Sequence, residues 1–253
     1  YHFSSALKRM SVIAGSTLPN STEVQYIATV KGAPETLKNM FSEIPSNYDA
    51  TYLSLSRRGA RVLALGYKRL PALNSQDIRN MSRDELESDL VFAGFVIISC
   101  PLKPDSAAVI KEIINASHLV VMITGDNPLT ACHVSRELHF TKKPTTLILT
   151  WKEKKWCWES VDQSETIELG GKNIEPKKEI WKNYALCVTG DGLEYLRDNE
   201  PGLLKKLFPY IVIYARCEPK QKEFIIISLQ ELGFTTLMCG DGTNDVGALK
   251  HAQ

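Results

Sequence analysis

An apolar run that ends in Gly-Asp and leads directly into a helix occurs twice in this chain. This repeat constrains the fold more than any other feature. The first run covers residues 117–124, is rich in β-branched residues and stops at Gly125-Asp126-Asn127. Pro128 follows, at the first helical position that Pro prefers, and predicts a helix as far as Leu138. Apolar runs that alternate with helices are typical of a parallel sheet, in which ligands collect beyond the carboxyl ends of the strands.

The second run, residues 235–239, ends at a turn with two carboxylates, Asp241 and Asp245, and Asn244 between them. A helix-like stretch follows at once, so we expect a buried strand that meets a helix here. Mg²⁺ prefers oxygen ligands and is usually held by one or two carboxylates plus a substrate phosphate. An exposed turn rich in Asp, Asn and Gly is the alternative interpretation. The flanking strand and helix favour a metal and phosphate site.

In the first copy of the pattern, the Thr124 hydroxyl could bind a phosphoryl oxygen and Asp126 could orient the loop. Helices also begin with capping Asp or Asn side chains, and a cap explains this segment equally well when it is taken alone. A third such segment, Thr189-Gly-Asp-Gly192, precedes an ordinary helix, and we expect a helix cap there without a catalytic role.

Positive charge gathers at the start of another helix. The apolar run 210–215 leads to Pro219, and Arg216, Lys220 and Lys222 surround the predicted helix start. The helix dipole disfavours cations at this end by up to about 1 kcal/mol each. Lysines at this position therefore indicate a nearby anion, such as a transferring phosphoryl group. Solvated lysines on an exposed turn are the alternative.

In this order, the segments resemble the signatures of the P-type ATPases, and the resemblance extends from Phe3 to Gln253. Its motifs are Lys31-Gly-Ala-Pro-Glu35, Thr124-Gly-Asp126, Arg216-Cys-Glu-Pro-Lys-Gln-Lys222 and Gly240-Asp-Gly-Thr-Asn-Asp245, with residues 3–10 and 61–65 as further nucleotide-contacting segments. Thr243, Val246-Gly247 and residues 100–104 look most like the type V, subgroup A branch. That branch extracts misinserted transmembrane helices from the endoplasmic reticulum membrane, so the resemblance implies the cytosolic face of that membrane.

The resemblance implies ATP and Mg²⁺ as cofactors and a role for each matching residue. Phe3 would stack on adenine, Lys8 and Lys31 would line the pocket, and Arg61 would reach the phosphates. For Phe3 alone, a core or terminal Phe is the favoured interpretation, and Lys31-Gly-Ala-Pro could by itself be a strand end before a helix.

The same resemblance implies how the phosphoryl group is held. Thr124 and Lys222 would bind it, Asp126 and Arg216 would position ATP, and Asp241 would ligate Mg²⁺. Such charge neutralisation and positioning is what phosphoryl transfer requires. The implied catalytic residues are Thr124, Gly125, Asp126, Lys222, Asn244 and Asp245; Arg216 joins the nucleotide residues, and Asp245 joins Asp241 as a metal residue.

The Asp-Lys-Thr-Gly-Thr segment that carries the phosphorylated aspartate of the family does not occur in this sequence. In the family it lies upstream, on a central strand. We therefore expect a fragment truncated at both ends, which cannot form an aspartyl-phosphate alone. Its partners would be the upstream phosphorylation strand, the actuator domain and the transmembrane helices of the same polypeptide.

The predicted fold class is α/β with two incomplete domains. Residues 1–99 are expected to be the C-terminal part of an α+β nucleotide-binding domain, and residues 100–253 a haloacid-dehalogenase-like phosphorylation domain that lacks its first strand. Within it, residues 141–182 form an expected insertion. Three clustered tryptophans there favour a packed β-hairpin over a partner-binding segment. Predicted strands at 24–30, 61–66 and 90–99, and helices at 34–41, 48–58 and 83–89, fill the first domain.

Composition excludes few alternatives. A net charge of +1, from 30 basic and 29 acidic residues, gives no reason to expect a nucleic-acid partner. The 6 cysteines are widely spaced, which favours reduced core thiols. Two other functions stay open: a soluble haloacid-dehalogenase-type phosphatase, and a non-catalytic nucleotide-binding module. The phosphatase would need its own nucleophilic Asp but no adenine pocket.

Overall fold

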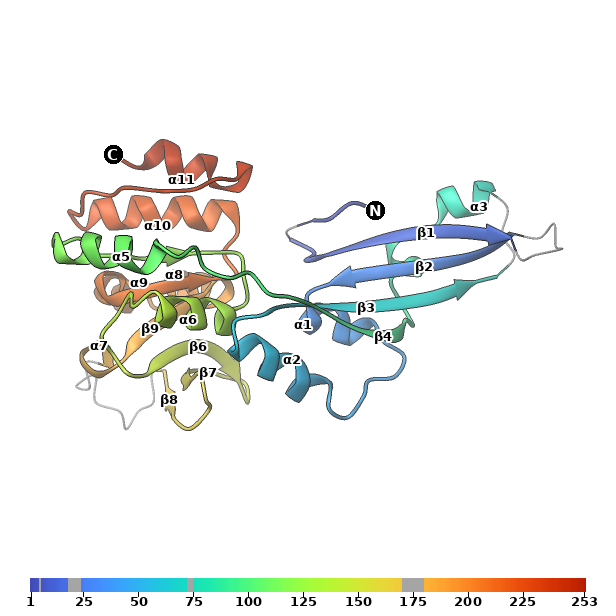
Figure 1. Cartoon of the computed structure of the whole chain (residues 1–253), viewed down its shortest axis with the longest axis horizontal. Coiled ribbons are helices and arrows are strands. Elements are labelled where there is room, and N and C mark those ends of the chain that lie inside the picture. The colour runs from blue at the N-terminus through green and yellow to red at the C-terminus, as the bar shows by residue number, and fades with distance from the viewer. Residues whose placement is uncertain (5, 18–23, 72–74, 170–179) are drawn as a thin grey trace. The chain divides into compact units, whose positions relative to one another are not determined.

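The computed structural model describes residues 1–4, 6–17, 24–71, 75–169 and 180–253. Residues 170–179, with Gly170 and Gly171 of the expected insertion, lie outside this range. The chain divides into two compact units, which Figure 1 shows. Unit 1 is Tyr1–Ser56 with Ala60–Cys100, and unit 2 is Arg57–Gly59 with Pro101–Gln253. Both units are mixtures of helices and strands, which agrees with the predicted α/β class.

Unit 1 is built on a four-stranded antiparallel sheet with the strand order β1-β2-β3-β4. Its strands are β1 (Arg9–Thr17), β2 (Val24–Gly32), β3 (Arg61–Leu70) and β4 (Val91–Ile98). Lys31 of β2 pairs with Met10 on one side and Leu65 on the other. Burial alternates along β2, where Ala28 and Val30 are buried and Thr29 and Lys31 are exposed. One face of the sheet therefore packs against a core while the other stays accessible.

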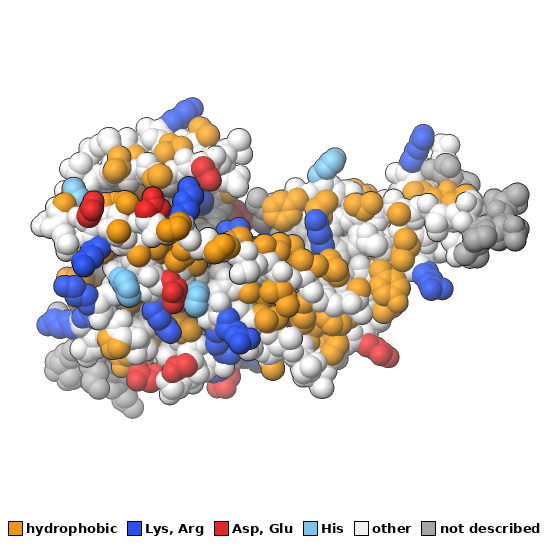
Figure 2. Space-filling view, in the orientation of Figure 1, with side chains coloured by type: hydrophobic (Ala, Val, Ile, Leu, Met, Phe, Trp, Pro, Cys, Tyr) orange, Lys and Arg blue, Asp and Glu red, His pale blue; other side chains and the backbone are white. Residues whose placement is uncertain are grey.

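Short helices contribute to the core on the buried face of this sheet: α1 (Pro34–Leu37), η1 (Lys38–Met40) and α2 (Tyr48–Arg57). The other described helices of unit 1 are α3 (Ser75–Asn80) and α4 (Arg83–Leu86). The core cluster is largely aromatic: Phe41 and Tyr48 pack with Phe92 and Phe95 in edge-on or tilted ring contacts. Such ring pairs add to the stabilisation that comes from burial alone. Strands β1 to β3 face the viewer in Figure 1, and hydrophobic side chains show over them in Figure 2.

Unit 2 contains a six-stranded sheet with the order β5-β10-β9-β6-β7-β8. The first four of these strands pair in parallel, and β7 and β8 add on antiparallel. The strands are β5 (Met122–Ile123), β6 (Thr146–Lys152), β7 (Lys155–Ser160), β8 (Thr166–Glu168), β9 (Ala185–Thr189) and β10 (Ile211–Ala215). A parallel sheet of this kind needs helices on both faces, because its strands are buried on both sides.

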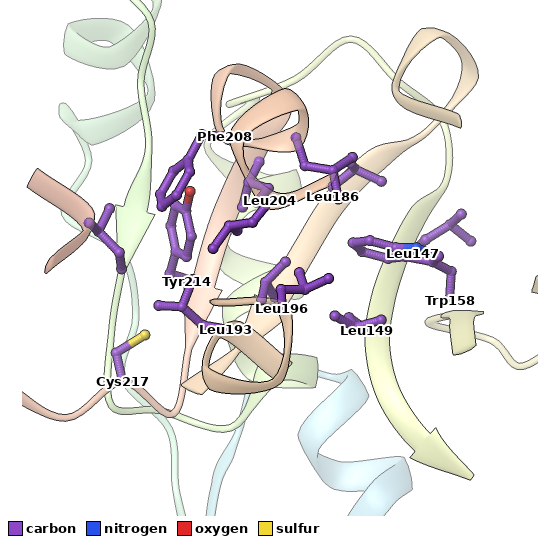
Figure 3. Packing of buried hydrophobic residues seen from close by; sticks show 14 residues of the cluster. Leu147, Leu149, Trp158, Leu186, Leu193, Leu196, Leu204, Phe208, Tyr214 and Cys217 are labelled. Carbon is purple, nitrogen blue, oxygen red and sulfur yellow. The ribbon is translucent and has the colours of Figure 1, made fainter. Parts of the chain in front are cut away.

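The helices of unit 2 provide this cover. They are α5 (Ser106–Asn115), α6 (Pro128–Glu137), α7 (Ile180–Asn183), α8 (Gly190–Asn199), α9 (Pro201–Leu207), η2 (Phe208–Tyr210), α10 (Pro219–Glu231), η3 (Thr243–Asp245) and α11 (Val246–His251). In Figure 3, Leu193 and Leu196 of α8 pack among Tyr214, Leu186 and Leu149 of the sheet. Alternate β9 residues point the other way, and Cys187 meets Cys132 of α6. None of these helices or those of unit 1 is long and apolar enough to cross a membrane.

Two predicted strands differ in the structure. Of residues 117–124, only Met122–Ile123 form a strand, and residues 235–239 form none. Leu237, expected inside, is 90% exposed, and Leu119 is 71% exposed. A strand needs a neighbour for its backbone groups; β5 pairs with β10 alone, and the described residues give 235–239 no strand to pair with.

The tryptophan-rich segment forms the predicted hairpin. Strand β6 pairs antiparallel with β7, and Trp151 lies opposite Trp156. Trp158 is buried in the core, while Trp156 stacks on Tyr195 of α8 with ring centroids 5.0 Å apart. All 6 cysteines are free thiols, and four of them are buried: Cys132, Cys157, Cys187 and Cys217.

Candidate functional site

The carboxyl ends of the parallel strands in unit 2 carry the predicted phosphate-binding motifs. Strand β5 ends at Ile123, directly before Thr124-Gly125-Asp126, and β10 ends at Ala215, directly before Arg216. Because β5 and β10 are parallel neighbours, these two motifs lie at the same edge of the sheet. Ligands of open α/β sheets bind at this edge.

Backbone hydrogen bonds join the two motifs. The Thr124 amide donates to the Tyr214 carbonyl over 2.9 Å, and the Cys217 amide donates to the Thr124 carbonyl over 3.0 Å. The Arg216 amide donates to the Asp126 carbonyl over 3.1 Å. The Thr124 Oγ1 accepts from the Asp126 amide over 3.1 Å, so this hydroxyl also shapes its own loop. Burial raises the pKa of the neighbouring Cys217 thiol to about 12, which keeps it protonated at neutral pH.

Arg216 adds a side-chain connection. Its Nη1 donates to the Gly125 carbonyl over 3.2 Å, and its backbone has a φ of 54°. This left-handed conformation is uncommon for a residue with a Cβ and persists where the surroundings fix it. A Cβ added at Gly190 would lie 2.6 Å from the Arg216 carbonyl oxygen, so only glycine lets the two loops approach this closely.

Lys222 and Asp245 meet although their motifs are separate in sequence. Lys222 is the fourth residue of α10, and its Nζ lies 2.7 Å from the Asp245 Oδ1. The Gly242 amide donates to the other carboxylate oxygen over 3.3 Å. The hydrogen bond from Lys222 lowers the pKa of Asp245, against the smaller effect of burial. A Cβ at Gly240 would lie 2.6 Å from that of Asp245, so the turn needs glycine at this position.

Asp241 and Asn244 occupy the same turn and are exposed. The described residues contain no group of three or more His, Cys, Asp or Glu side chains that could hold a metal ion. The donors nevertheless fit Mg²⁺, which needs only one or two carboxylates when a phosphate supplies further oxygens. Asp241 is the carboxylate best placed for this role, because Asp245 already binds Lys222.

The predicted nucleotide residues gather at one end of the sheet in unit 1. The Ala33 amide, just beyond β2, donates to the Lys8 carbonyl over 3.0 Å, and Lys31 lies near the end of β2. Arg61 begins β3, four residues before Leu65, the partner of Lys31. Because side chains alternate along a strand, Lys31 and Arg61 point to the same accessible face, roughly 13 Å apart along the strands. Phe3 is 62% exposed and precedes Ser4, which bridges to Arg9.

Comparison with known proteins agrees with these motifs. Residues 1–105 match the family described as "P-type ATPase, cytoplasmic domain N". The whole chain is 45% identical to a probable manganese-transporting ATPase of Arabidopsis thaliana, of which it covers 20%. It is 42% and 43% identical to the endoplasmic reticulum transmembrane helix translocases of Schizosaccharomyces pombe and Saccharomyces cerevisiae, of which it covers 21% and 20%. Residues 1–105 are therefore similar to the cytoplasmic domain N of the P-type ATPases.

The chain spans about a fifth of the length of the curated relatives it matches. The family uses ATP with Mg²⁺, and its description refers to a cytoplasmic domain. The match to these relatives covers the whole chain and therefore includes the motifs of both units.

Sequence reasoning missed two buried residues that stabilise the two units. Gln221 accepts from the Glu218 amide over 2.9 Å and donates to the Gly190 carbonyl over 3.2 Å, which anchors the start of α10. Glu87 binds Arg9 and Arg83 in unit 1. The spacing of Arg83 and Glu87, four residues apart, was a weak signal in the sequence. Gln221 gave a similarly weak signal through Glu218, three residues before it, while its partners Gly190 and Glu194 lie far along the chain.

Proposed function

We propose that this chain binds ATP and handles its γ-phosphoryl group within an ATP-driven membrane translocase. Residues 1–99 would be the C-terminal part of the nucleotide-binding domain. Residues 100–253 would be a haloacid-dehalogenase-like phosphorylation domain without its first strand. The Lys222–Asp245 pair carries this proposal, because it brings a cation and an acidic turn together at the edge where Thr124 lies.

In unit 1, ATP would lie on the accessible face of the sheet. Phe3 would stack on the adenine ring, Lys8 and Lys31 would line the pocket, and Arg61 would reach the phosphates. Their common position at one sheet end supports these roles. The apolar neighbours of Lys31, Met10 and Leu65, are only half-buried and offer a surface for a planar base.

In unit 2, Thr124, Gly125 and Lys222 would hold the phosphoryl group, while Asp126 and Arg216 position the incoming nucleotide. Mg²⁺, bound through Asp241 with support from Asn244 and Asp245, would neutralise phosphate charge. Phosphoryl transfer depends mainly on such positioning and electrostatic stabilisation. The hydrogen bond between Lys222 and Asp245 supports this proposal, because it holds the lysine beside the acidic turn.

A segment of the same polypeptide outside this chain would complete unit 2. Strand β5 has a neighbour on one side only, residues 235–239 have no strand partner within the described residues, and Leu119 and Leu237 are largely exposed. The amphipathic helix α5 likewise leaves Val109 46% exposed. These features fit a missing apolar strand, which would carry the phosphorylated aspartate. Without it, the chain would form no aspartyl-phosphate.

The transported substrate is proposed from the names of the relatives and from the subgroup resemblance. Two of them are named as transmembrane helix translocases of the endoplasmic reticulum, and one as a manganese transporter. The Thr243 and Val246-Gly247 positions favour helix extraction at that membrane. The further partners would be the actuator domain and the transmembrane helices.

The test is acid-quenched labelling with γ-labelled ATP, in which this chain is compared with a longer version that includes its upstream sequence. We expect label in the longer protein only, and its release by hydroxylamine would identify an acyl-phosphate. Retained ATP binding without label in either protein would overturn the phosphoryl-transfer function and leave a nucleotide-binding module.

A binding experiment tests the two sites separately. Lys31→Ala should weaken ATP binding with or without Mg²⁺, whereas Asp241→Ala should remove only the Mg²⁺-dependent part. Lys250→Ala, an exposed lysine of α11, is the matched control for charge. Equal affinities in all four proteins would contradict the site assignment.

A further inference from the structure

A buried carboxylate lies behind the segment that carries Phe3 and Lys8. Glu87, at the end of α4, is only 3% exposed. Its Oε1 accepts from Arg83 Nε over 2.7 Å and from Ser11 Oγ over 2.9 Å, and its Oε2 accepts from Arg9 Nε. Burial alone would raise the pKa of Glu87, but the hydrogen bonds from Arg83, Arg9 and Ser11 outweigh it and lower that pKa. The carboxylate is therefore ionised, and three donors satisfy it.

The two arginines that bind Glu87 also donate hydrogen bonds to backbone carbonyls among the first nine residues. Arg9 Nη1 donates to the Leu7 carbonyl over 3.3 Å. Arg83 Nη2 donates to the Arg9 carbonyl over 3.1 Å and to the His2 carbonyl over 3.4 Å. Both ends of the turn between His2 and Arg9 are thus bound to groups that Glu87 orients.

That turn has a conformation that needs support. The Lys8 amide donates to the Ser4 carbonyl over 2.7 Å, and Lys8 has a φ of 54°. A non-glycine residue in the left-handed region is held there by its surroundings. A buried ion pair with further hydrogen bonds contributes to a single defined geometry as much as to stability.

We propose that Glu87 is a positioning residue for nucleotide binding: through Arg9 and Arg83 it fixes the turn that presents Phe3 and Lys8 to ATP. This inference rests on the proposed nucleotide site. Glu87 faces away from that site, since its partners are Ser11, Arg9 and Arg83, so it acts on ATP only through the turn.

The experiment compares Glu87→Gln with Asp84→Asn in the 253-residue chain. Both changes replace a carboxylate with an amide near α4, but Asp84 is exposed. Two quantities are measured: the Kd for ATP, and amide hydrogen exchange at Leu7 and Lys8 relative to Val30 in the core of unit 1. We expect Glu87→Gln to weaken ATP binding about fivefold or more, the lower limit of typical coupling between sites. Exchange at Lys8 should accelerate more than at Val30, and Asp84→Asn should change neither quantity.

Lys31→Ala distinguishes a failure of the positioning role of Glu87 from a failure of the proposed nucleotide site. If Lys31→Ala weakens ATP binding and Glu87→Gln does not, the positioning role is wrong while the nucleotide site stands. If neither variant changes ATP binding but exchange at Lys8 accelerates in Glu87→Gln, Glu87 fixes the turn and the nucleotide site is wrong. A uniform acceleration at Lys8 and Val30 would make Glu87 a merely structural residue and overturn the proposal.

A milder variant keeps the test informative if Glu87→Gln does not fold. Ser11→Ala removes one donor to Glu87 and leaves both arginines in place. We expect a smaller change in the same direction, namely faster exchange at Lys8 and weaker ATP binding. Unchanged exchange at Lys8 in this variant would count against the proposal.

Discussion

Lys222 and Asp245 form an ion pair of 2.7 Å between segments 23 residues apart, and their side chains are only 12% and 10% exposed. The pair ties the first turn of α10 to the turn before α11. No strand leads into that second turn, so its position depends on side chains. The ion pair is therefore both the centre of the proposed phosphoryl site and a main anchor of the C-terminal segment.

Lys222→Met should destabilise unit 2 by about 1–3 kcal/mol, because it leaves a largely buried carboxylate without its donor. The pKa of Asp245 should rise as well, since the hydrogen bond from Lys222 is what lowers it. Urea denaturation followed by tryptophan fluorescence measures this, and all 4 tryptophans lie in unit 2.

The double variant Lys222→Met with Asp245→Asn is the control for this pair. It should be more stable than the sum of the single changes predicts, because no charge is left unpaired. Lys250→Met, on the exposed side of α11, should have little effect. Strict additivity of Lys222→Met and Asp245→Asn would show that the two residues do not interact.

Tyr214→Phe should leave unit 2 unchanged or stabilise it by up to about 1 kcal/mol. The Tyr214 hydroxyl is fully buried and has no hydrogen-bond partner within the described part of the chain. An unsatisfied buried polar group costs about 1–3 kcal/mol, and phenylalanine removes it without a cavity. Thermal denaturation measures the change, with Tyr214→Leu as the variant that opens a cavity beside Phe208. A clear loss of stability in Tyr214→Phe would mean that the hydroxyl has a partner such as a buried water.

Local signals predicted much of the fold. Pro34, Pro128 and Pro219 each begin a helix as expected, because their fixed φ suits the first helical position. Strands β2 and β3 also begin where predicted, at Val24 and Arg61. These elements contain their own start signals and find their partners within the chain.

The two strands that were wrong show the limit of such signals. Residues 235–239 are apolar enough for a buried strand, yet Leu237 is exposed. Apolar residues indicate that a segment is suited to burial, but they do not show whether the described chain contains a partner to bury it. Strand β1 was missed for a different reason: the apolar residues of Arg9–Thr17 do not alternate, since Val12, Ile13 and Ala14 are consecutive, and pairing with β2 over its full length specifies the strand. The nearness of Lys222 to Asp245 followed from the resemblance, while Glu87 depended on tertiary contacts that no local pattern indicates.

The tryptophans of the β6–β7 hairpin should contribute very differently to stability. Trp158→Ala should cost about 3–5 kcal/mol, because its side chain is 2% exposed and packs in the core. Trp151→Ala should cost well under 1 kcal/mol, since Trp151 is 57% exposed. Far-ultraviolet circular dichroism during urea denaturation measures both without relying on the removed fluorophore. A large cost at Trp151 would indicate that this exposed ring packs against another part of unit 2.

The stability of unit 1 should depend on pH through Glu87. Its pKa is lowered in the folded state, so its contribution is fully present above the ordinary Glu pKa of about 4.3 and is lost as the pH falls through the lower folded value. Glu87→Gln should remove this contribution near pH 7, mainly at the turn that Arg9 and Arg83 anchor, because it breaks a buried pair, and the difference from the native chain should vanish at low pH. NMR signals of Leu7 and Lys8, followed in urea between pH 3 and pH 7, measure the difference, because this range includes the ordinary pKa of Glu. Asp84→Asn, at an exposed position of the same helix, should show no such trend. A cost for Glu87→Gln that stays constant over this range would mean that the side chain acts by its shape and not by its charge.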